Sequence, residues 1–254
     1  MDLGLKGKNA IVTGGTGSLG FGISEVLAEE GANIIIVHRH DTEERDRMVK
    51  ELAERTGVSV KTYVCDLSEE DQVLELFKKL DEEYEHLDVL VNNAQGGSVR
   101  KGIADVTYDE WMSSIDGIVI PVYLMCREFI SRALERKQTA NIVNISAKSA
   151  ELARHKMKIG YTTCKGMVNS MTKRIADDYC EQGIRVNSIM PGYIWGGFFH
   201  GDESVRKAWE EECGLRIGWA TPRDLGNIVA FLSSDCSKQI IGVNIDTSGG
   251  TMLG

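Results

Sequence analysis

The sequence predicts an α/β fold in which helices cover both faces of one parallel, doubly wound sheet. Short runs rich in valine and isoleucine recur along the whole chain, and stretches long enough for crossover helices lie between them. Because these runs are apolar on both faces, we expect buried parallel strands. The expected strands are Asn9–Thr13, Asn33–Val37, Ser59–Cys65, Leu87–Val91, Asn141–Ile145, Arg185–Met190 and Val243–Asp246.

The first expected crossover helix follows the first strand. Leu19, Ile23 and Leu27 repeat at helical spacing and predict an apolar stripe, and Gly31 follows as a helix C-cap would. Residues 66–71 (DLSEED) predict an N-cap and an acidic first turn for a helix after the third strand. No linker, repeat or low-complexity segment interrupts the alternation, so we expect one domain over residues 1–254.

The composition is that of a globular protein, and it argues against several classes of partner. Hydrophobic residues make up 42% of the 254 residues, which is too apolar for a disordered chain. The net charge of −9 argues against a nucleic-acid partner, which requires a basic footprint. The longest apolar run, residues 117–126, is too short to span a bilayer, and the N-terminus lacks the pattern of a secretory signal. We therefore expect no membrane partner.

The cysteines and histidines give no sign of a metal centre. The 6 cysteines are widely scattered and contain no CxxC pair. This predicts neither a disulfide framework nor a zinc site, and it favours reduced thiols in the cytoplasm. His38 and His40 share one face of an extended strand, but no third ligand lies nearby in the sequence, so we predict no metal site.

In a doubly wound sheet, ligands bind outside the carboxyl ends of the strands. After the first strand comes a glycine-rich turn, residues 13–20 (TGGTGSLG), that opens directly into a helix. Glycines let the backbone approach a pyrophosphate, and the helix N-terminus offers free N–H groups and the positive end of the helix dipole. The strand, turn, helix and next strand are all present, so the turn predicts nucleotide binding, with a purely structural turn as the alternative.

A tyrosine and a lysine further along the chain are candidates for acid–base chemistry. Tyr161 and Lys165 are four positions apart, so on a helix they lie on one face, about one turn apart. A free phenol has a pKa of about 10, and a nearby ammonium favours the phenolate and lowers that pKa. The pair therefore predicts Tyr161 as proton donor and acceptor, with Lys165 as its electrostatic support.

Three further motifs complete a recognisable set: Asn92-Asn93-Ala94, Pro191-Gly192 and Asp246-Thr247-Ser248-Gly249-Gly250. In this order, and over nearly the whole chain, the set resembles the short-chain dehydrogenase/reductase family. The resemblance implies a Rossmann-like single domain, a nicotinamide cofactor, and hydride transfer between an alcohol and a carbonyl. It also implies a variable substrate loop at about residues 193–218, and a dimer or tetramer formed through two helices and the C-terminal segment.

By position, the resemblance assigns cofactor contacts along the carboxyl ends of the strands. The family residue that contacts adenine matches Asp66, whose alternative role is a helix cap. NAD-preferring members carry an acidic residue where this chain has His38 followed by Arg39, which favours NADP(H) slightly over NAD(H), with a solvated arginine as the alternative. The implied cofactor-binding residues are Gly14, Gly17, Ser18, Leu19, Gly20, Arg39, Asp66, Leu67, Asn92, Ala94, Lys165, Pro191, Gly192 and Ile194.

Five departures from the family pattern cluster around the expected reaction site. They are Ser18 for a glycine of the turn, Gln95 for the glycine after Asn-Asn-Ala, Ile118 for a helix asparagine, Ala147 for the catalytic serine, and Gly196 for a threonine that holds the carboxamide. Counted back from Tyr161, the serine position is Lys148 instead, and a loop shifted by one residue presents Ser149. Loss of such an oxyanion-type donor costs about 10²–10³ in rate.

The departures leave two interpretations open. In the first, the chain is an NAD(P)-dependent dehydrogenase or reductase that interconverts a secondary alcohol and a ketone through Tyr161, Lys165 and Ser149, and forms a homodimer or homotetramer. In the second, it is a non-catalytic subunit that pairs with an active dehydrogenase chain in a hetero-oligomer. The retained tyrosine and lysine favour the enzyme.

Two segments carry information on a small-molecule substrate. Arg100-Lys101 and residues 154–158 (RHKMK) are basic segments of an acidic protein, which favours a carboxylate, phosphate or acyl-CoA, with a solvated loop or a subunit contact as the alternative. Residues 193–200 (YIWGGFFH) are rich in aromatics separated by glycines. That pattern suits a lid over an apolar or aromatic group, or else buried packing or an interface.

Overall fold

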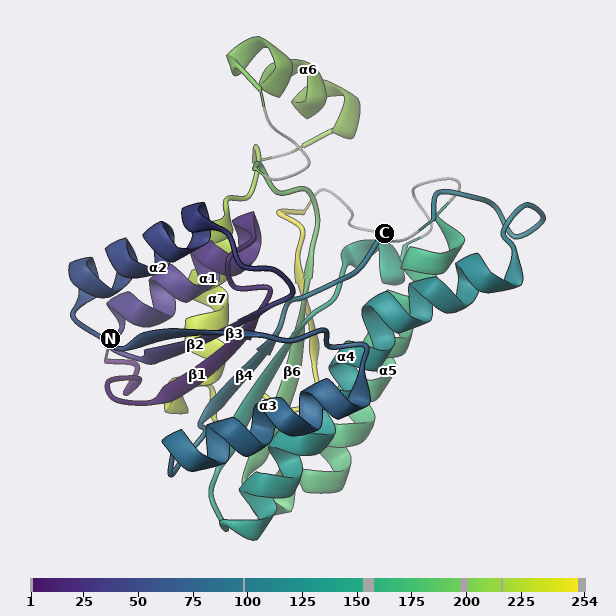
Figure 1. The fold of residues 1–254 in the computed structure, drawn as a ribbon. Helices are drawn as coiled ribbons and strands as arrows, with labels where there is room; N and C mark the ends of the chain where they lie inside the picture. The colour runs from purple at the N-terminus through teal and green to yellow at the C-terminus, as the bar shows by residue number, and fades with distance from the viewer. Residues whose placement is uncertain (1, 98, 153–157, 197–200, 216, 251–254) are drawn as a thin grey trace.

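The computed structural model describes residues 2–97, 99–152, 158–196, 201–215 and 217–250. Seven parallel strands form one sheet in the order β3-β2-β1-β4-β5-β6-β7 (Figure 1). The predicted α/β class is confirmed, and each expected strand is found within two residues of its expected ends. The strands are β1 (Asn9–Thr13), β2 (Asn33–His38), β3 (Val60–Val64), β4 (Val89–Asn92), β5 (Ala140–Ile145), β6 (Ile184–Pro191) and β7 (Asn244–Thr247).

Helices cover both faces of this sheet (Figure 1). One layer consists of α3 (Glu70–Glu83), α4 (Tyr108–Glu135) and α5 (Ile159–Tyr179). The other consists of α1 (Ser18–Glu29), α2 (Glu43–Thr56) and α7 (Pro222–Ser233). Helix α6 (Glu203–Cys213) stands apart from both layers, beyond the carboxyl ends of the strands. No helix among the described residues is long and apolar enough to cross a membrane.

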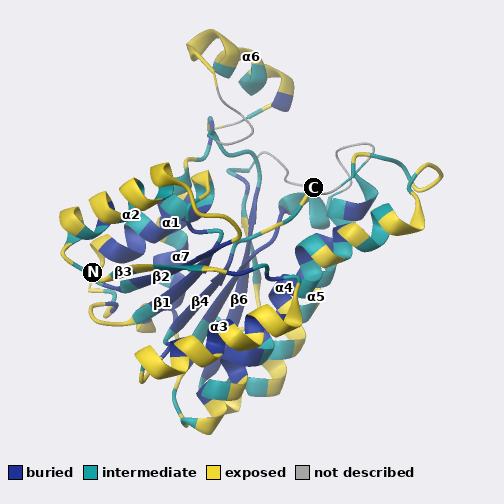
Figure 2. Ribbon diagram, in the orientation of Figure 1, coloured by how far each residue is buried: buried dark blue, intermediate teal, exposed yellow. Residues whose placement is uncertain are grey.

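The sheet separates two hydrophobic cores. Ile11 and Ile35 face the layer of α3, α4 and α5, whereas Val12 and Ile36 face the layer of α1, α2 and α7. Side chains alternate along a strand, so these central strands are apolar on both faces, and Figure 2 shows them buried. The expectation of full burial is wrong for β3 and β7, which are partly exposed because each forms an edge and pairs with one neighbour only.

The predicted helix ends are partly correct. Gly31 follows the end of α1 with a φ of +86°, as the predicted C-terminal glycine requires. The predicted cap at Asp66 is wrong, because α3 begins at Glu70 after Glu69. Asp66 instead accepts hydrogen bonds from the Ser68 backbone N–H at 3.0 Å and from the Ser68 hydroxyl at 2.7 Å. The acidic first turn of α3 is confirmed.

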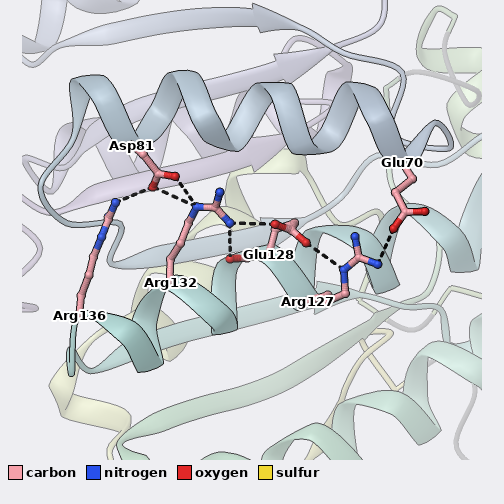
Figure 3. A network of polar contacts seen from close by, with 6 residues as sticks. All are labelled: Glu70, Asp81, Arg127, Glu128, Arg132 and Arg136. Carbon is pink, nitrogen blue, oxygen red and sulfur yellow. Dashed lines mark hydrogen bonds and ion pairs between the residues drawn. The ribbon is translucent and has the colours of Figure 1, made fainter.

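An ion-pair network joins α3 to α4 (Figure 3). Asp81 accepts from Arg132 at 2.8 Å and also pairs with Arg136. Arg132 binds Glu128 one turn earlier at 2.8 Å, and Arg127 links Glu128 to Glu70. These arginines therefore hold the two helices together.

Candidate active site

The glycine turn after β1 is built from close backbone contacts. Gly14 has a φ of +64°, and its N–H donates to the Val37 carbonyl at 2.7 Å. A side chain at Gly20 would lie 2.2 Å from the Gly14 carbonyl oxygen, so only glycine fits there. Gly17 is the N-cap of α1, and no side chain caps that end of the helix. The first N–H groups of α1 thus suit an anionic ligand.

The loop after β4 is bound directly to this turn. The hydroxyl of Thr13 accepts from the backbone N–H groups of Asn93 and Ala94, each at 2.9 Å. Asn92 points the other way, because its buried amide donates to Asn144 Oδ1 at 2.8 Å. The reversal of strand order between β1 and β4 makes these loops neighbours, which is where a doubly wound fold places its ligand.

A cavity of about 870 Å³ runs from the glycine turn to the start of α5. Its volume lies within the range of about 300–1,000 Å³ that is usual for cofactor and ligand sites. Asp66, Asn92 and Lys165, which the sequence assigns to the site, lie outside its lining. The predicted residues that line it are Gly14, Gly17, Ser18, Leu19, Gly20, Arg39, Leu67, Ala94, Ser149, Tyr161, Pro191, Gly192 and Ile194.

Two arginines line the cavity beyond the end of β2. Arg39 forms an ion pair with Asp66 at 3.1 Å, and Arg45, from the first turn of α2, hydrogen-bonds the His40 carbonyl. Burial alone would raise the pKa of Asp66. The hydrogen bonds from Ser68 and the charge of Arg39 together outweigh burial, so the pKa is lower than usual. Arg45 was not predicted from the sequence, although it lies only six residues after Arg39, because no family motif marks its position.

Tyr161 and Lys165 lie on one face of α5, as predicted, with Lys165 Nζ 5.9 Å from the centre of the tyrosine ring. The ammonium donates to the Ile145 carbonyl at 2.6 Å. Burial raises the pKa of Tyr161 to about 12 and lowers the pKa of Lys165 to about 8. The predicted lowering of the tyrosine pKa is therefore wrong for this structure, because burial of the phenol dominates while a backbone carbonyl holds the ammonium.

The segment after β5 carries the three positions considered for the missing serine. Ala147 and Ser149 both line the cavity, whereas Lys148 does not. Lys148 begins a short 3-10 helix and pairs with Asp246 at 3.1 Å and with Glu151 at 3.0 Å. Ser146 lines the cavity too, but its hydroxyl donates to the Lys165 carbonyl at 3.2 Å, and Ser149 lies two residues beyond Ala147 along the same wall.

Two of the five departures lie against each other. A side chain at Gly196 would come within 2.8 Å of the Ser18 hydroxyl oxygen, so the two residues share the space of one side chain at the cavity wall. Ile118, on α4, is 1% exposed and packs in the core between that helix and the sheet. Gly117, just before it, lines the cavity and accepts from the Gly96 N–H at 2.6 Å. The close approach of these two glycines leads the loop after β4 across α4.

The aromatic segment after β6 is partly packed. Trp219 is buried and meets the rings of Tyr193 at 6.1 Å and Trp195 at 5.0 Å, both edge-on. The backbone N–H of Trp195 donates to the Ala220 carbonyl at 2.9 Å. Tyr193 lines the cavity. The other predicted aromatics, Phe198 and Phe199, lie outside the described residues, as do the basic residues 154–157.

Comparisons with known proteins agree with this geometry. The family model described as enoyl-(acyl carrier protein) reductase matches residues 14–252. The chain is 32% identical over 249 residues to the 3-oxoacyl-(acyl-carrier-protein) reductase of Chlamydia muridarum, covering 97% of this chain and 98% of that protein. It is 27% identical over 250 residues to the sorbose reductase of Candida albicans, covering 97% of this chain and 87% of that protein.

A solved structure shares both the fold and the extent of the chain. The crystal structure of the NADPH-dependent 3-quinuclidinone reductase from Rhodotorula rubra superposes with a TM-score of 0.87 at 25% identity, covering 98% of this chain and 93% of that one. The chain belongs to the short-chain dehydrogenase/reductase family. It is, by class, an NAD(P)-dependent oxidoreductase that acts on alcohols and ketones.

Proposed function

We propose that the cavity holds NADP(H) in preference to NAD(H), and that Tyr161 exchanges the proton of a secondary alcohol or ketone beside it. The observation that carries this proposal is the continuity of the cavity, which joins the glycine turn and Arg39 at one end to Ser149 and Tyr161 at the other. A dinucleotide needs such a connected path between the two ends.

The described residues suit the parts of the coenzyme. The uncapped N-terminus of α1 and the glycine turn would hold the pyrophosphate. Arg39 and Arg45 would hold a 2′-phosphate, which supports NADP(H), because both arginines line the cavity beyond β2, where the strand ends in His38 and not in an acidic residue. Pro191, Gly192 and Ile194, which also line the cavity, would contact the nicotinamide. When bound, the nicotinamide supplies or accepts the hydride.

Tyr161 would act as the acid in the direction of ketone reduction. With a pKa of about 12, the phenol keeps its proton at neutral pH. Ser149 would donate a hydrogen bond to the substrate carbonyl and so stabilise the charge that develops on its oxygen. Lys165 acts through position, since its ammonium is fixed on the Ile145 carbonyl beneath the tyrosine.

The substrate proposal follows from the walls at the reacting end. Tyr193, backed by Trp219, presents an aromatic surface to the cavity, which suits a substrate with an apolar or aromatic group. The loop around residues 193–218 would carry this specificity. The six free thiols suit a reducing compartment, and we propose the cytoplasm.

A non-catalytic subunit that pairs with an active dehydrogenase is the second candidate, and the losses at Ala147 and Ile118 favour it. The open cavity with Tyr161 at its wall favours the enzyme, which we propose forms a homodimer or homotetramer. A hetero-oligomer with a second chain of the family belongs to the alternative.

Titration of the protein with NADPH and NADH, followed by nicotinamide fluorescence, tests the choice. We expect saturable binding, tighter for NADPH, and oxidation of NADPH with a panel of aryl ketones. Tyr161→Phe is expected to lower the rate by about 10²–10⁴ while NADPH affinity stays within twofold. Failure of both coenzymes to bind, together with copurification of a second dehydrogenase-like chain, would establish the partner subunit instead.

Two variants, one that removes a serine and one that adds one, test the cavity wall beside Tyr161. Ser149→Ala is expected to lower turnover by about 10²–10³. Ala147→Ser is expected to raise it, because it returns a hydroxyl to the position matched on β5. An unchanged rate in both coenzyme-bound variants would show that neither position faces the substrate carbonyl.

A further inference from the structure

Two positive side chains lie together on the cavity wall at the reacting end. Arg100 belongs to the loop between β4 and α4, and Lys158 is the N-cap of α5. Tyr161 follows Lys158 by three positions on the same helix, and all three residues line the one cavity. The Ile159 N–H reaches the Lys101 carbonyl at 3.5 Å, so the two segments that carry these cations are joined beside the site.

The neighbouring Lys101 differs from Lys158 because it has a carboxylate partner. Its ammonium pairs with Glu110 at 2.7 Å, so its charge is already balanced. Within the described part of the chain, no carboxylate lies within ion-pair distance of Lys158. Lys158 is also only partly exposed, in contrast to most surface lysines.

This arrangement is electrostatically costly in the ligand-free protein. Burial, and then the charge of Arg100, lower the pKa of Lys158. A partly desolvated ammonium beside a guanidinium loses hydration and gains repulsion, and an anion placed between them removes both costs. A negative group that enters the cavity beside Lys158 therefore relieves the cost to this ammonium.

We propose that Arg100 and Lys158 form a subsite for an oxyanion, a carboxylate or phosphate, carried by the substrate whose carbonyl meets Tyr161. This inference rests on the proposed function and adds the substrate class to it. The anion belongs to the substrate rather than to the coenzyme, because the coenzyme phosphates have the α1 N-terminus and two arginines at the opposite end of the cavity.

The test compares ligands that differ only in charge. The probes are aryl keto carboxylates of two chain lengths and the primary amides made from them, titrated by calorimetry into the NADP⁺-bound full chain. We expect the wild type to bind the carboxylates about tenfold to hundredfold more tightly than the amides, as hydrogen bonds to charged groups allow. Lys158→Met should remove most of that preference and leave amide affinity unchanged. Lys101→Met, the matched control, should keep it.

Titration with coenzyme distinguishes failure of the anion subsite from failure of the proposed function. NADPH affinity is expected to be the same in wild type, Lys158→Met and Arg100→Met, since the subsite serves the substrate. A wild type that binds NADPH but does not prefer the carboxylates, whether it binds both probes equally or neither, overturns the subsite and leaves the proposed function intact. A tenfold loss of NADPH affinity in Lys158→Met overturns the subsite too, by assigning the anion to the coenzyme. A wild type that binds no coenzyme overturns the proposed function itself.

Discussion

At the scale of single residues, the pairing of Ser18 with Gly196 changes how the departures are understood. Taken separately, each looks like the loss of a family residue. In the structure the Ser18 hydroxyl stands where a side chain at 196 would project. We therefore interpret Gly196 and Ser18 as linked substitutions, because the two residues are neighbours in the cavity wall.

This pairing predicts a coupling energy. Gly196→Ala places a Cβ 2.8 Å from the Ser18 hydroxyl at a φ of +109°, so it should destabilise the fold by about 1–3 kcal/mol. Ser18→Gly should relieve the contact but not the backbone cost, and because the Ser18 hydroxyl can rotate away, we expect a coupling of about 0.5 kcal/mol in urea denaturation. Gly57→Ala, at a φ of +75° with open space around it, should show the backbone cost alone. Additive effects would contradict the pairing.

Lys165 predicts a pH dependence of stability. Its pKa is about 8 in the folded protein and about 10.4 when unfolded, so between pH 8 and 10 the unfolded chain binds more protons. Stability should therefore rise with pH there, by up to about 1.4 kcal/mol per pH unit, relative to Lys165→Met. Paired urea denaturation curves measure this. The exposed control, Lys173→Met, should show no such difference, and a Lys165 difference that is flat with pH would mean the ammonium is not desolvated.

At the scale of elements, some helices line the cavity and some are joined by ion pairs. Helices α1, α4 and α5 all contribute residues to the cavity, and α4 is also joined to α3 by the network of Figure 3. Asp81 is central to that network because it receives both Arg132 and Arg136. The charges are partly buried, so they are screened less than a surface pair.

Removal of this charge should loosen α3 from α4. Asp81→Asn is expected to lower the free energy of unfolding by about 1 kcal/mol, with a smaller loss at high salt. Glu75→Gln removes an exposed ion pair, the one with Lys79 at 4.0 Å, and should cost less than about 0.5 kcal/mol. Thermal or urea unfolding at low and high ionic strength measures both, and an equal effect for the two variants would show that the network adds nothing to stability.

At the scale of the whole molecule, the strands and the cavity position followed from the sequence because both depend on local patterns. Runs such as Ile34–Val37 are apolar on both faces, and the glycine turn has to follow β1. The side-chain directions did not follow. Asn92 turns into the sheet and Asn93 toward the cavity, since one step along a strand reverses the face. The meeting of Ser18 with Gly196 depends on packing between distant segments.

The pKa values of Tyr161 and Lys165 likewise could not be predicted from residue spacing. Spacing alone predicts that Lys165 acts on Tyr161, but the outcome depends on how deeply each group is buried and on the Ile145 carbonyl that holds the ammonium. Those quantities arise from the packing of β5 against α5, which no local pattern records.

The central claim is that one open cavity places a bound nicotinamide beside Tyr161. A crystal of the protein soaked with NADP⁺ measures this directly. The account predicts density for the dinucleotide along the carboxyl ends of the strands, with the pyrophosphate at the α1 N-terminus and the nicotinamide ring next to the tyrosine. Clear density for side chains filling that space, with no coenzyme at saturating concentration, would contradict it.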